Sequence, residues 1–232
     1  MKHALAIVLG LLMLEAAAAS ASPCPQIVLQ PKVMTPATRA LAPGEGVVVS
    51  WLGYWNKTAV PFDVDRAKWR FSNGATPAST PPSETVLAPG LSVFLPDATA
   101  TVFEDGKRAA IFRVTRSTAA ARELPAPRIV SLRRTAPTKV KYPSVNTVVT
   151  VRDVPATAIA LVAYAKDGKT AGSWGELADS AATIYSQSSC VPSSPNTRDW
   201  QPGELIRIAW IDAAGRVSKL SAPVKVVAVP ER

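Results

Sequence analysis

Residues 202–218 read Pro202-Gly203-Glu204-Leu205-Ile206-Arg207-Ile208-Ala209-Trp210-Ile211-Asp212-Ala213-Ala214-Gly215-Arg216-Val217-Ser218. Large apolar side chains occupy every second position from Ile206 to Trp210, and this period of two is that of a β-strand. We therefore expect Ile206, Ile208 and Trp210 to point into a core, and Arg207 and Ala209 to face outward. The Asp-x-x-Gly sequence that follows predicts a tight turn into a final strand.

Similar patterns recur along the rest of the chain. In 47–51, Val47, Val49 and Trp51 would share one strand face, with Ser50 on the other. Residues 99–103 and 109–115 flank an Asp105-Gly106 pair, which is a strong hairpin signal. The 21 prolines leave little room for long helices. Short strands separated by turn residues predict an all-β protein built from β-sandwiches.

The 202–218 stretch, with the Ser221-Ala222-Pro223-Val224 that follows it, resembles the last hairpin of bacterial fibronectin type III or immunoglobulin-like modules. In those modules an apolar strand ends in Asp-x-x-Gly, and Ser-x-Pro marks the final strand. The resemblance implies a sandwich used for display or binding, and it carries no shared active site. We expect two such domains in tandem after a signal peptide.

The ends and the middle of the chain suggest how it is divided. Residues 1–21 combine a basic start, an apolar run and small residues, as a cleaved secretory signal does. The proline-rich stretch 122–127 resembles a linker. These features predict a signal peptide at 1–21, an N-terminal sandwich at 22–123 and a C-terminal sandwich at 127–232. The mature protein is then expected in the periplasm or outside the cell, and no later segment is apolar enough for a transmembrane helix.

The chain has two cysteines, Cys24 and Cys190. In an oxidising compartment such a pair usually forms a disulfide. We expect this bond to tie the start of the first domain to a long loop of the second. An intermolecular bridge or a free thiol is the alternative.

Histidine is nearly absent, since His3 is the only one and would leave with the signal peptide. The mature chain could then build neither a Ser-His-Asp triad nor a zinc site on imidazole. Asp63 and Asp65 would share one strand face, as a glycosidase pair could, although two solvated edge charges are the better interpretation. We therefore expect a protein without enzymatic activity that binds neither a cofactor nor a metal ion.

The formal charge of +9 is unevenly distributed. Residues 107–152 carry eleven Lys and Arg side chains against one acid, Glu123, and the surface expected to bind a polyanion comprises Lys107, Arg108, Arg133, Arg134, Lys139 and Lys141. Such a field would attract acidic polysaccharide or an anionic membrane surface, although a solvated basic face is the alternative. We call residues 107–152 the basic block. Nucleic acid is not expected, because the chain is exported and the block contains only two aromatic residues, Phe112 and Tyr142, on which bases could stack.

Two groups of aromatic residues are candidates for ligand contact. Tyr54, Trp55 and Lys57 lie at the end of an expected strand, where Gly53 interrupts the alternation. Trp174 lies among small residues after an Asp167-Gly168 turn, which favours an accessible ring, although structural packing is the alternative. Exposed aromatic faces stack on sugar rings.

These features together predict a secreted or periplasmic protein that works by binding, with an anionic polysaccharide or a protein of the cell envelope or surface as its partner. The layout is also similar to that of periplasmic pilus-assembly chaperones, which makes a chaperone-like assembly factor the alternative. A carbohydrate-active enzyme is the third possibility. The sequence does not indicate an oligomeric state.

Overall fold

The structure is a computed structural model. It describes residues 32–36, 40–42, 45–50, 52–55, 58–61, 69–72, 83–95, 99–104, 107–114, 123–136, 144–188 and 198–230. For Ala40, 52–55, 58–61, 69–72, 99–104, 107–114, Ala136 and Ser188, only the backbone is described.

The described residues form strands and no helix, which confirms the all-β prediction. The strands of the N-terminal half are β1 (Lys32–Val33), β2 (Ala40–Leu41), β3 (Val47–Ser50), β4 (Leu52–Trp55), β5 (Thr58–Pro61), β6 (Trp69–Ser72), β7 (Ser83–Ala88), β8 (Leu91–Leu95), β9 (Thr99–Glu104) and β10 (Lys107–Val114). Those of the C-terminal half are β11 (Arg128–Ala136), β12 (Ser144–Arg152), β13 (Ala158–Ala165), β14 (Ala171–Ala178), β15 (Ala181–Ser188), β16 (Leu205–Asp212), β17 (Val224–Lys225) and β18 (Val227–Pro230).

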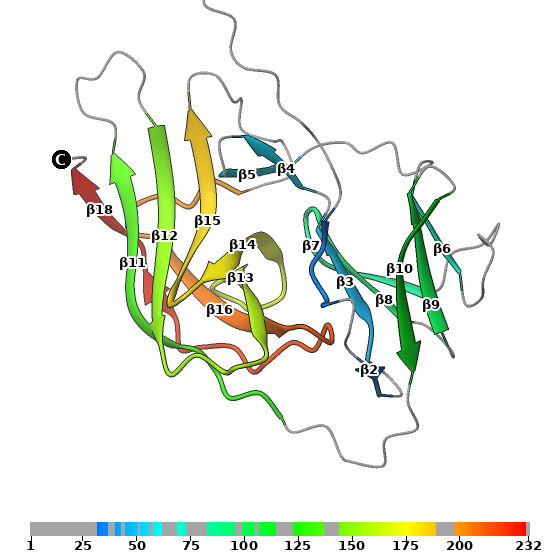
Figure 1. Ribbon diagram of the computed structural model, residues 1–232. Coiled ribbons are helices and arrows are strands. Elements are labelled where there is room, and N and C mark those ends of the chain that lie inside the picture. The colour runs from blue at the N-terminus through cyan, green and yellow to red at the C-terminus, as the bar shows by residue number, and fades with distance from the viewer. Residues whose placement is uncertain are drawn as a thin grey trace, which may run out of the picture.

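The C-terminal half forms one eight-stranded sheet that folds over on itself (Figure 1). Its order is β17-β16-β13-β14-β15-β12-β11-β18. The outermost strands, β17 and β18, are consecutive in the chain, and only Val226 separates them. The sheet is therefore nearly closed, with β17-β16-β13-β14 as one layer and β15-β12-β11-β18 as the other.

A hydrophobic core fills the space between these two layers. One layer contributes Leu132 of β11, Val149 of β12 and Ile184 of β15. The facing layer contributes Leu161 of β13 and three residues of β16. Ile206, Ile208 and Trp210 are at most 1% exposed, so the predicted inward facing of these three side chains is confirmed.

The turns predicted around this core are present. Gly168, Gly203 and Gly215 all have positive φ, as the Asp-Gly, Pro-Gly and Asp-x-x-Gly signals require. The expected linker is less open than its prolines suggest, because Leu124 is 8% exposed and belongs to the core cluster. The segment 123–127 therefore packs against the sandwich before β11 begins.

The N-terminal half has two four-stranded sheets and one separate pair. The sheets are ordered β1-β3-β8-β7 and β2-β10-β9-β6, and β4 pairs with β5. The hairpin predicted around Asp105-Gly106 is confirmed, since β9 and β10 pair antiparallel. The described residues of this half are all-β, and the expected sandwich in 22–123 stays a prediction.

The sheet of β1, β3, β8 and β7 packs on the outer face of the β13–β14–β16 layer. A second apolar cluster joins Val48, Leu91 and Val93 to Val162 and Ile211 across this contact. Strand β13 is consequently buried on both faces, which explains why residues 159–163 read as a continuous apolar run. Ala209 was predicted to face outward, yet it is 0% exposed, and its register partner Val162 belongs to the second cluster.

Polar bonds at the turn after β16 reinforce the contact between the halves. The Oγ1 of Thr35 donates to the Ala213 carbonyl at 2.8 Å, and the Gly46 amide donates to the Ala214 carbonyl at 2.9 Å. The turn itself is built on Asp212, whose carboxylate accepts from the backbone amides of Ala214 and Arg216. The two halves are therefore joined through main-chain groups as well as through apolar packing.

Candidate functional site

Four strand ends of the C-terminal sandwich lie together at one end of the structure. Ser144, where β12 begins, is the register partner of Ser188, where β15 ends. Ala136, the last residue of β11, is likewise paired with Pro230 of β18. Figure 1 shows these ends on the same side, beside the C-terminus. Arg128 and Arg152, which are register partners, lie at the opposite end of the same layer.

The segment 198–204 closes the core at this end and contacts both layers. Trp200 is 0% exposed, and its Nε1 donates to the Oγ of Ser173 on β14 at 2.6 Å. The backbone amide of Arg198 donates to the Gly172 carbonyl, and its guanidinium carbon lies 4.4 Å from the centre of the Trp200 ring. Asp199, between these two residues, turns to the other layer.

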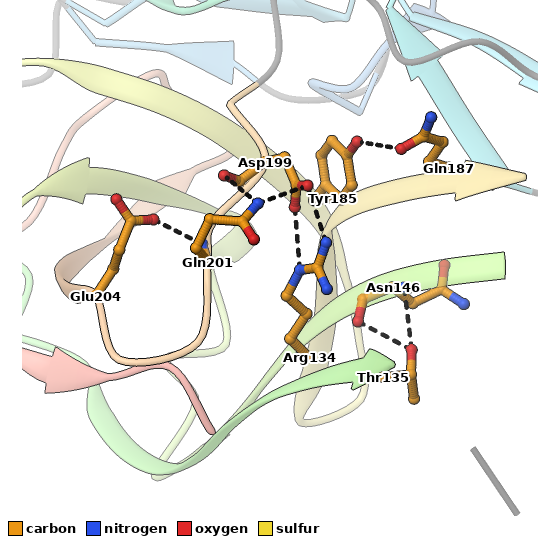
Figure 2. A network of polar contacts seen from close by, with 8 residues as sticks. All are labelled: Arg134, Thr135, Asn146, Tyr185, Gln187, Asp199, Gln201 and Glu204. Atoms are coloured by element: carbon orange, nitrogen blue, oxygen red, sulfur yellow. Dashed lines mark hydrogen bonds and ion pairs between the residues drawn. The ribbon is translucent and has the colours of Figure 1, made fainter. Parts of the chain in front are cut away.

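Asp199 forms a two-pronged ion pair with Arg134 of β11 (Figure 2). Nε of Arg134 donates to Oδ1 at 3.1 Å, and Nη2 donates to Oδ2 at 2.9 Å. The Arg134 side chain is 13% exposed and that of Asp199 is 30% exposed. Gln201 adds a third bond, from Nε2 to Oδ2 at 2.7 Å. Paired bonds of this kind fix the plane of a guanidinium, so Arg134 is held in one orientation.

The core side of the neighbouring strands is also polar at this end. Arg134, Thr147 and Tyr185 are successive register partners on β11, β12 and β15. Thr147 and Tyr185 are buried, and Thr147 continues the inward series of Val149 and Val151. The Tyr185 hydroxyl donates to Oε1 of Gln187 at 2.8 Å (Figure 2).

Thr147 differs from its neighbours in one respect. Its residue is 0% exposed, and its Oγ1 has no hydrogen-bond partner within the part of the chain that the structure describes. An unpaired hydroxyl in a core costs about 1–3 kcal/mol. We define the polar end as Arg134, Thr147, Tyr185, Gln187, Asp199 and Gln201.

The outer face of the same strands carries a separate set of polar contacts. Asn146 and Ser186 are register partners, and the Ser186 hydroxyl donates to Oδ1 of Asn146 at 2.7 Å. Thr135 Oγ1 accepts from the Asn146 amide and donates to its carbonyl (Figure 2). These bonds tie β11, β12 and β15 together where they end, so the polar end is carried on a firmly paired sheet.

Only part of the expected polyanion surface falls on described side chains. Arg133 is exposed and has no ion pair with a described residue, whereas Arg134 is engaged by Asp199. Lys107 and Arg108 begin β10, whose side chains are not described. Lys139 and Lys141 lie outside the described residues, between the ends of β11 and β12.

The aromatic candidates have different outcomes. Trp174 is 3% exposed, and its Nε1 donates to the Pro89 carbonyl at 3.1 Å, so the expectation of an accessible ring was wrong. The sheet of the N-terminal half covers this face, which the small neighbours of Trp174 in the sequence do not reveal. Tyr54 and Trp55 lie on β4, where only the backbone is described, and Lys57 lies outside the described residues.

The expected disulfide cannot be placed, since Cys24 and Cys190 both lie outside the described residues, as do Asp63 and Asp65. The described residues contain no group of three His, Cys, Asp or Glu side chains that could hold a metal ion. In the same part of the chain we find no helix able to cross a membrane.

Sequence reasoning did not find the residues that make up most of the polar end. Asp199 and Gln201 flank Trp200 in a stretch without alternation, so no local pattern marks them as site residues. Thr147 was the available signal, since it is a polar residue at an inward position of the alternating stretch 145–151. No protein-family model matches the chain, and no curated protein matches it.

Proposed function

We propose that this chain is an exported, non-enzymatic binding protein of the bacterial cell envelope or surface, and that it engages a polysaccharide at the polar end. The observation that carries the proposal is the buried Thr147 hydroxyl without a partner among the described residues. Buried polar groups are nearly always hydrogen-bonded, and a bound ligand supplies the missing bond. Its register partner Arg134, held by Asp199, presents further donors in a fixed orientation.

Binding without catalysis is supported by the composition of the chain. The only histidine is at position 3, within the expected signal peptide. The proposed secretion of the mature protein rests on the expected signal peptide at 1–21. At the polar end, the one carboxylate, Asp199, is already occupied by three hydrogen bonds. A carboxylate held in this way orients its neighbours rather than abstracting a proton.

The strand order supports a fibronectin type III or immunoglobulin-like module in 127–232. Counting from β11, the first, second, fifth and eighth strands form one layer, and the third, fourth, sixth and seventh form the other. Immunoglobulin constant-type domains differ from this order in the layer that holds the fourth strand. In antibody variable domains the binding loops include those that join the second strand to the third and the sixth to the seventh. The corresponding turns here, after β12 and after β16, lie at the opposite end of the sandwich from the polar end, so the proposal does not rest on that likeness.

Retention on immobilised polysaccharides tests the proposal. We would compare a neutral set, consisting of dextran, mannan and β-glucan, with polygalacturonate and dextran sulfate, and elute with the same soluble polymer. We expect specific retention on at least one polymer. Absence of retention on all of them, with the protein folded, contradicts the proposed function.

The basic block adds a second, electrostatic arm to this test. Arg133→Gln and Arg152→Gln remove the same charge from exposed arginines at opposite ends of the β11–β12 pair. If the basic side chains near the polar end contribute to binding, Arg133→Gln weakens retention on a polyanion. Arg152→Gln is the matched control and leaves retention unchanged.

A chaperone-like assembly factor is the second candidate, and β7 favours it. This strand forms one edge of its sheet, and Ser83, Thr85 and Val86 are exposed, Val86 at 64%. An exposed edge can accept a partner's strand. Gentle extraction should then copurify a subunit, and Val86→Lys should release it. Failure to copurify any protein argues for the polysaccharide proposal.

A further inference from the structure

The cations around the polar end are largely neutralised, which bears on the kind of ligand. Arg134 is paired with Asp199, and Arg198 is paired with Glu204 through a 2.6 Å contact between Nη2 and Oε1. At the far end of the layer, Arg128 pairs with Asp153. On the core side of these strands, where the buried polar groups gather, the described cation is Arg134, and Asp199 compensates its charge. Arg133, the next residue on β11, is exposed and has no ion pair with a described residue.

Hydrogen-bonding capacity, in contrast, is left over at the polar end. A guanidinium has five N–H donors, and Arg134 uses Nε and Nη2 on Asp199, which leaves Nη1 without a described partner. Gln187 accepts from Tyr185 through Oε1, and both N–H donors of its Nε2 likewise have no described partner. The Thr147 hydroxyl can donate one bond and accept two.

This mixture of donors and acceptors, with the Asp199 carboxylate among them, disfavours a bare anion. A sulfate or a phosphate diester has acceptors only, and Asp199 would repel it. A sugar hydroxyl both donates and accepts, so one ring can satisfy an N–H of Arg134 or Gln187 and the oxygen of Thr147 together. Sites built to bond a hydroxyl also discriminate strongly against analogues that lack it.

We infer that the polar end recognises the hydroxyl groups of a neutral sugar through Arg134, Thr147 and Gln187, and not the charge of a polyanion. The inference rests on the proposed polysaccharide-binding function and names its ligand class. Thr147 is 0% exposed, so the sugar hydroxyl reaches it only when a covering side chain moves aside. The Arg134–Asp199 pair is the fixed part of the site.

The experiment uses the full mature chain and measures retention and affinity on the immobilised dextran, mannan and β-glucan, with polygalacturonate and dextran sulfate as polyanions. Each is measured at about 50 mM and about 500 mM NaCl, across which exposed charges are strongly screened. The variants are Thr147→Val, which keeps the shape and removes the hydroxyl, and Arg133→Gln, which removes an exposed charge.

The expected result is binding to a neutral polymer that changes less than about 2-fold with salt. Thr147→Val should weaken it at least 10-fold, as the loss of one bond to a buried group implies. Arg133→Gln should leave it unchanged. The midpoint of urea unfolding of Thr147→Val should equal or exceed that of the parent, because the replacement removes an unpaired hydroxyl from the core.

Two results overturn the inference, and they are distinguishable. Retention on polyanions alone, weakened by salt and by Arg133→Gln but unaffected by Thr147→Val, overturns the ligand class and leaves the proposed binding function in place. Absence of retention on every polymer overturns both. A Thr147→Val chain that binds as the parent does while unfolding earlier shows that the hydroxyl serves the fold, which also overturns the inference.

Discussion

The Trp200 indole donates a 2.6 Å hydrogen bond from Nε1 to the Oγ of Ser173, and neither residue is exposed to solvent. The bond joins the segment 198–204 to β14 and thereby holds Asp199 opposite Arg134. The Trp200 side chain therefore both closes the core and positions the residue next to it at the polar end.

Removing this bond should destabilise the fold. We expect Ser173→Ala to lower the free energy of unfolding by about 1–3 kcal/mol, because the indole N–H is left buried without a partner. Urea unfolding of Ser173→Ala, Trp200→Phe and the double variant measures the coupling between the two groups. The double variant should be less destabilised than the sum of the singles. Exact additivity contradicts a direct bond.

Gly175 allows β14 to pass close to β15 where the sheet turns from one layer to the other. A Cβ built there would overlap the Thr183 carbonyl oxygen, which belongs to the backbone and cannot rotate away. We expect Gly175→Ala to cost about 1–3 kcal/mol and to lower the melting temperature. Gly203→Ala is the control, since nothing lies within 4 Å of its Cβ. Its cost should be limited to about 1–2 kcal/mol of strain at φ +93°.

The alternation in 205–211 was a sound guide to the C-terminal core, because one face of that layer meets the other layer of its own half. The same pattern misled for Ala209, and the small neighbours of Trp174 misled for that residue. Trp174 and Val162, the register partner of Ala209, both belong to the cluster shared with the sheet from residues 32–95. Period-2 reasoning distinguishes two faces, but it does not reveal that both are buried. The apolar run in β13 was the available warning, since Ala160 and Leu161 point to different cores.

The polar end was the least predictable part. Arg134 and Asp199 are 65 residues apart, and charge counting placed Arg134 on an open basic surface. The fold instead brings Asp199 to it, because Trp200 enters the core and fixes its neighbour. Pairing between distant residues depends on how the layers close, which local patterns do not encode.

Asp212 is the key residue of the turn that docks against the N-terminal half. Its buried carboxylate accepts from two backbone amides and contacts the Arg216 guanidinium at 2.6 Å. We expect Asp212→Ala to cost about 3–5 kcal/mol, because the guanidinium and both amides lose their partner. Thermal unfolding measures the loss. Asp153→Asn breaks an exposed pair with Arg128 and should change stability by less than about 0.5 kcal/mol; equal effects would count against the role of the turn.

Tyr164 should make the stability of the fold fall at alkaline pH. Burial raises the pKa of this phenol above its usual value of 10.0. The unfolded chain therefore loses the Tyr164 proton at a lower pH than the folded chain, so stability falls as the pH rises through about 10. Urea unfolding between pH 8 and 11 should show a shallower decline for Tyr164→Phe than for the parent. Parallel declines would assign the effect to other groups.

The second apolar cluster predicts that the two halves unfold together. Leu91 of β8 and Leu161 of β13 are each 0% exposed, and they lie in different clusters that share the β13–β14–β16 layer. Either Leu→Ala replacement should cost about 2–5 kcal/mol. If the halves form one cooperative unit, Leu91→Ala must speed amide exchange in β13 and β16 as much as in β3 and β8.

Hydrogen exchange followed by mass spectrometry resolves these peptides separately. Val130→Ala, at a position 60% exposed, is the matched control and should change exchange little. Faster exchange confined to β3 and β8 after Leu91→Ala would mean that the halves open independently. The described contacts between them are apolar packing, hydrogen bonds and ion pairs such as Lys32–Glu176. Since a reductant breaks none of these, the coupling should also persist when one is added. Its loss on reduction would instead assign the coupling to Cys24 and Cys190.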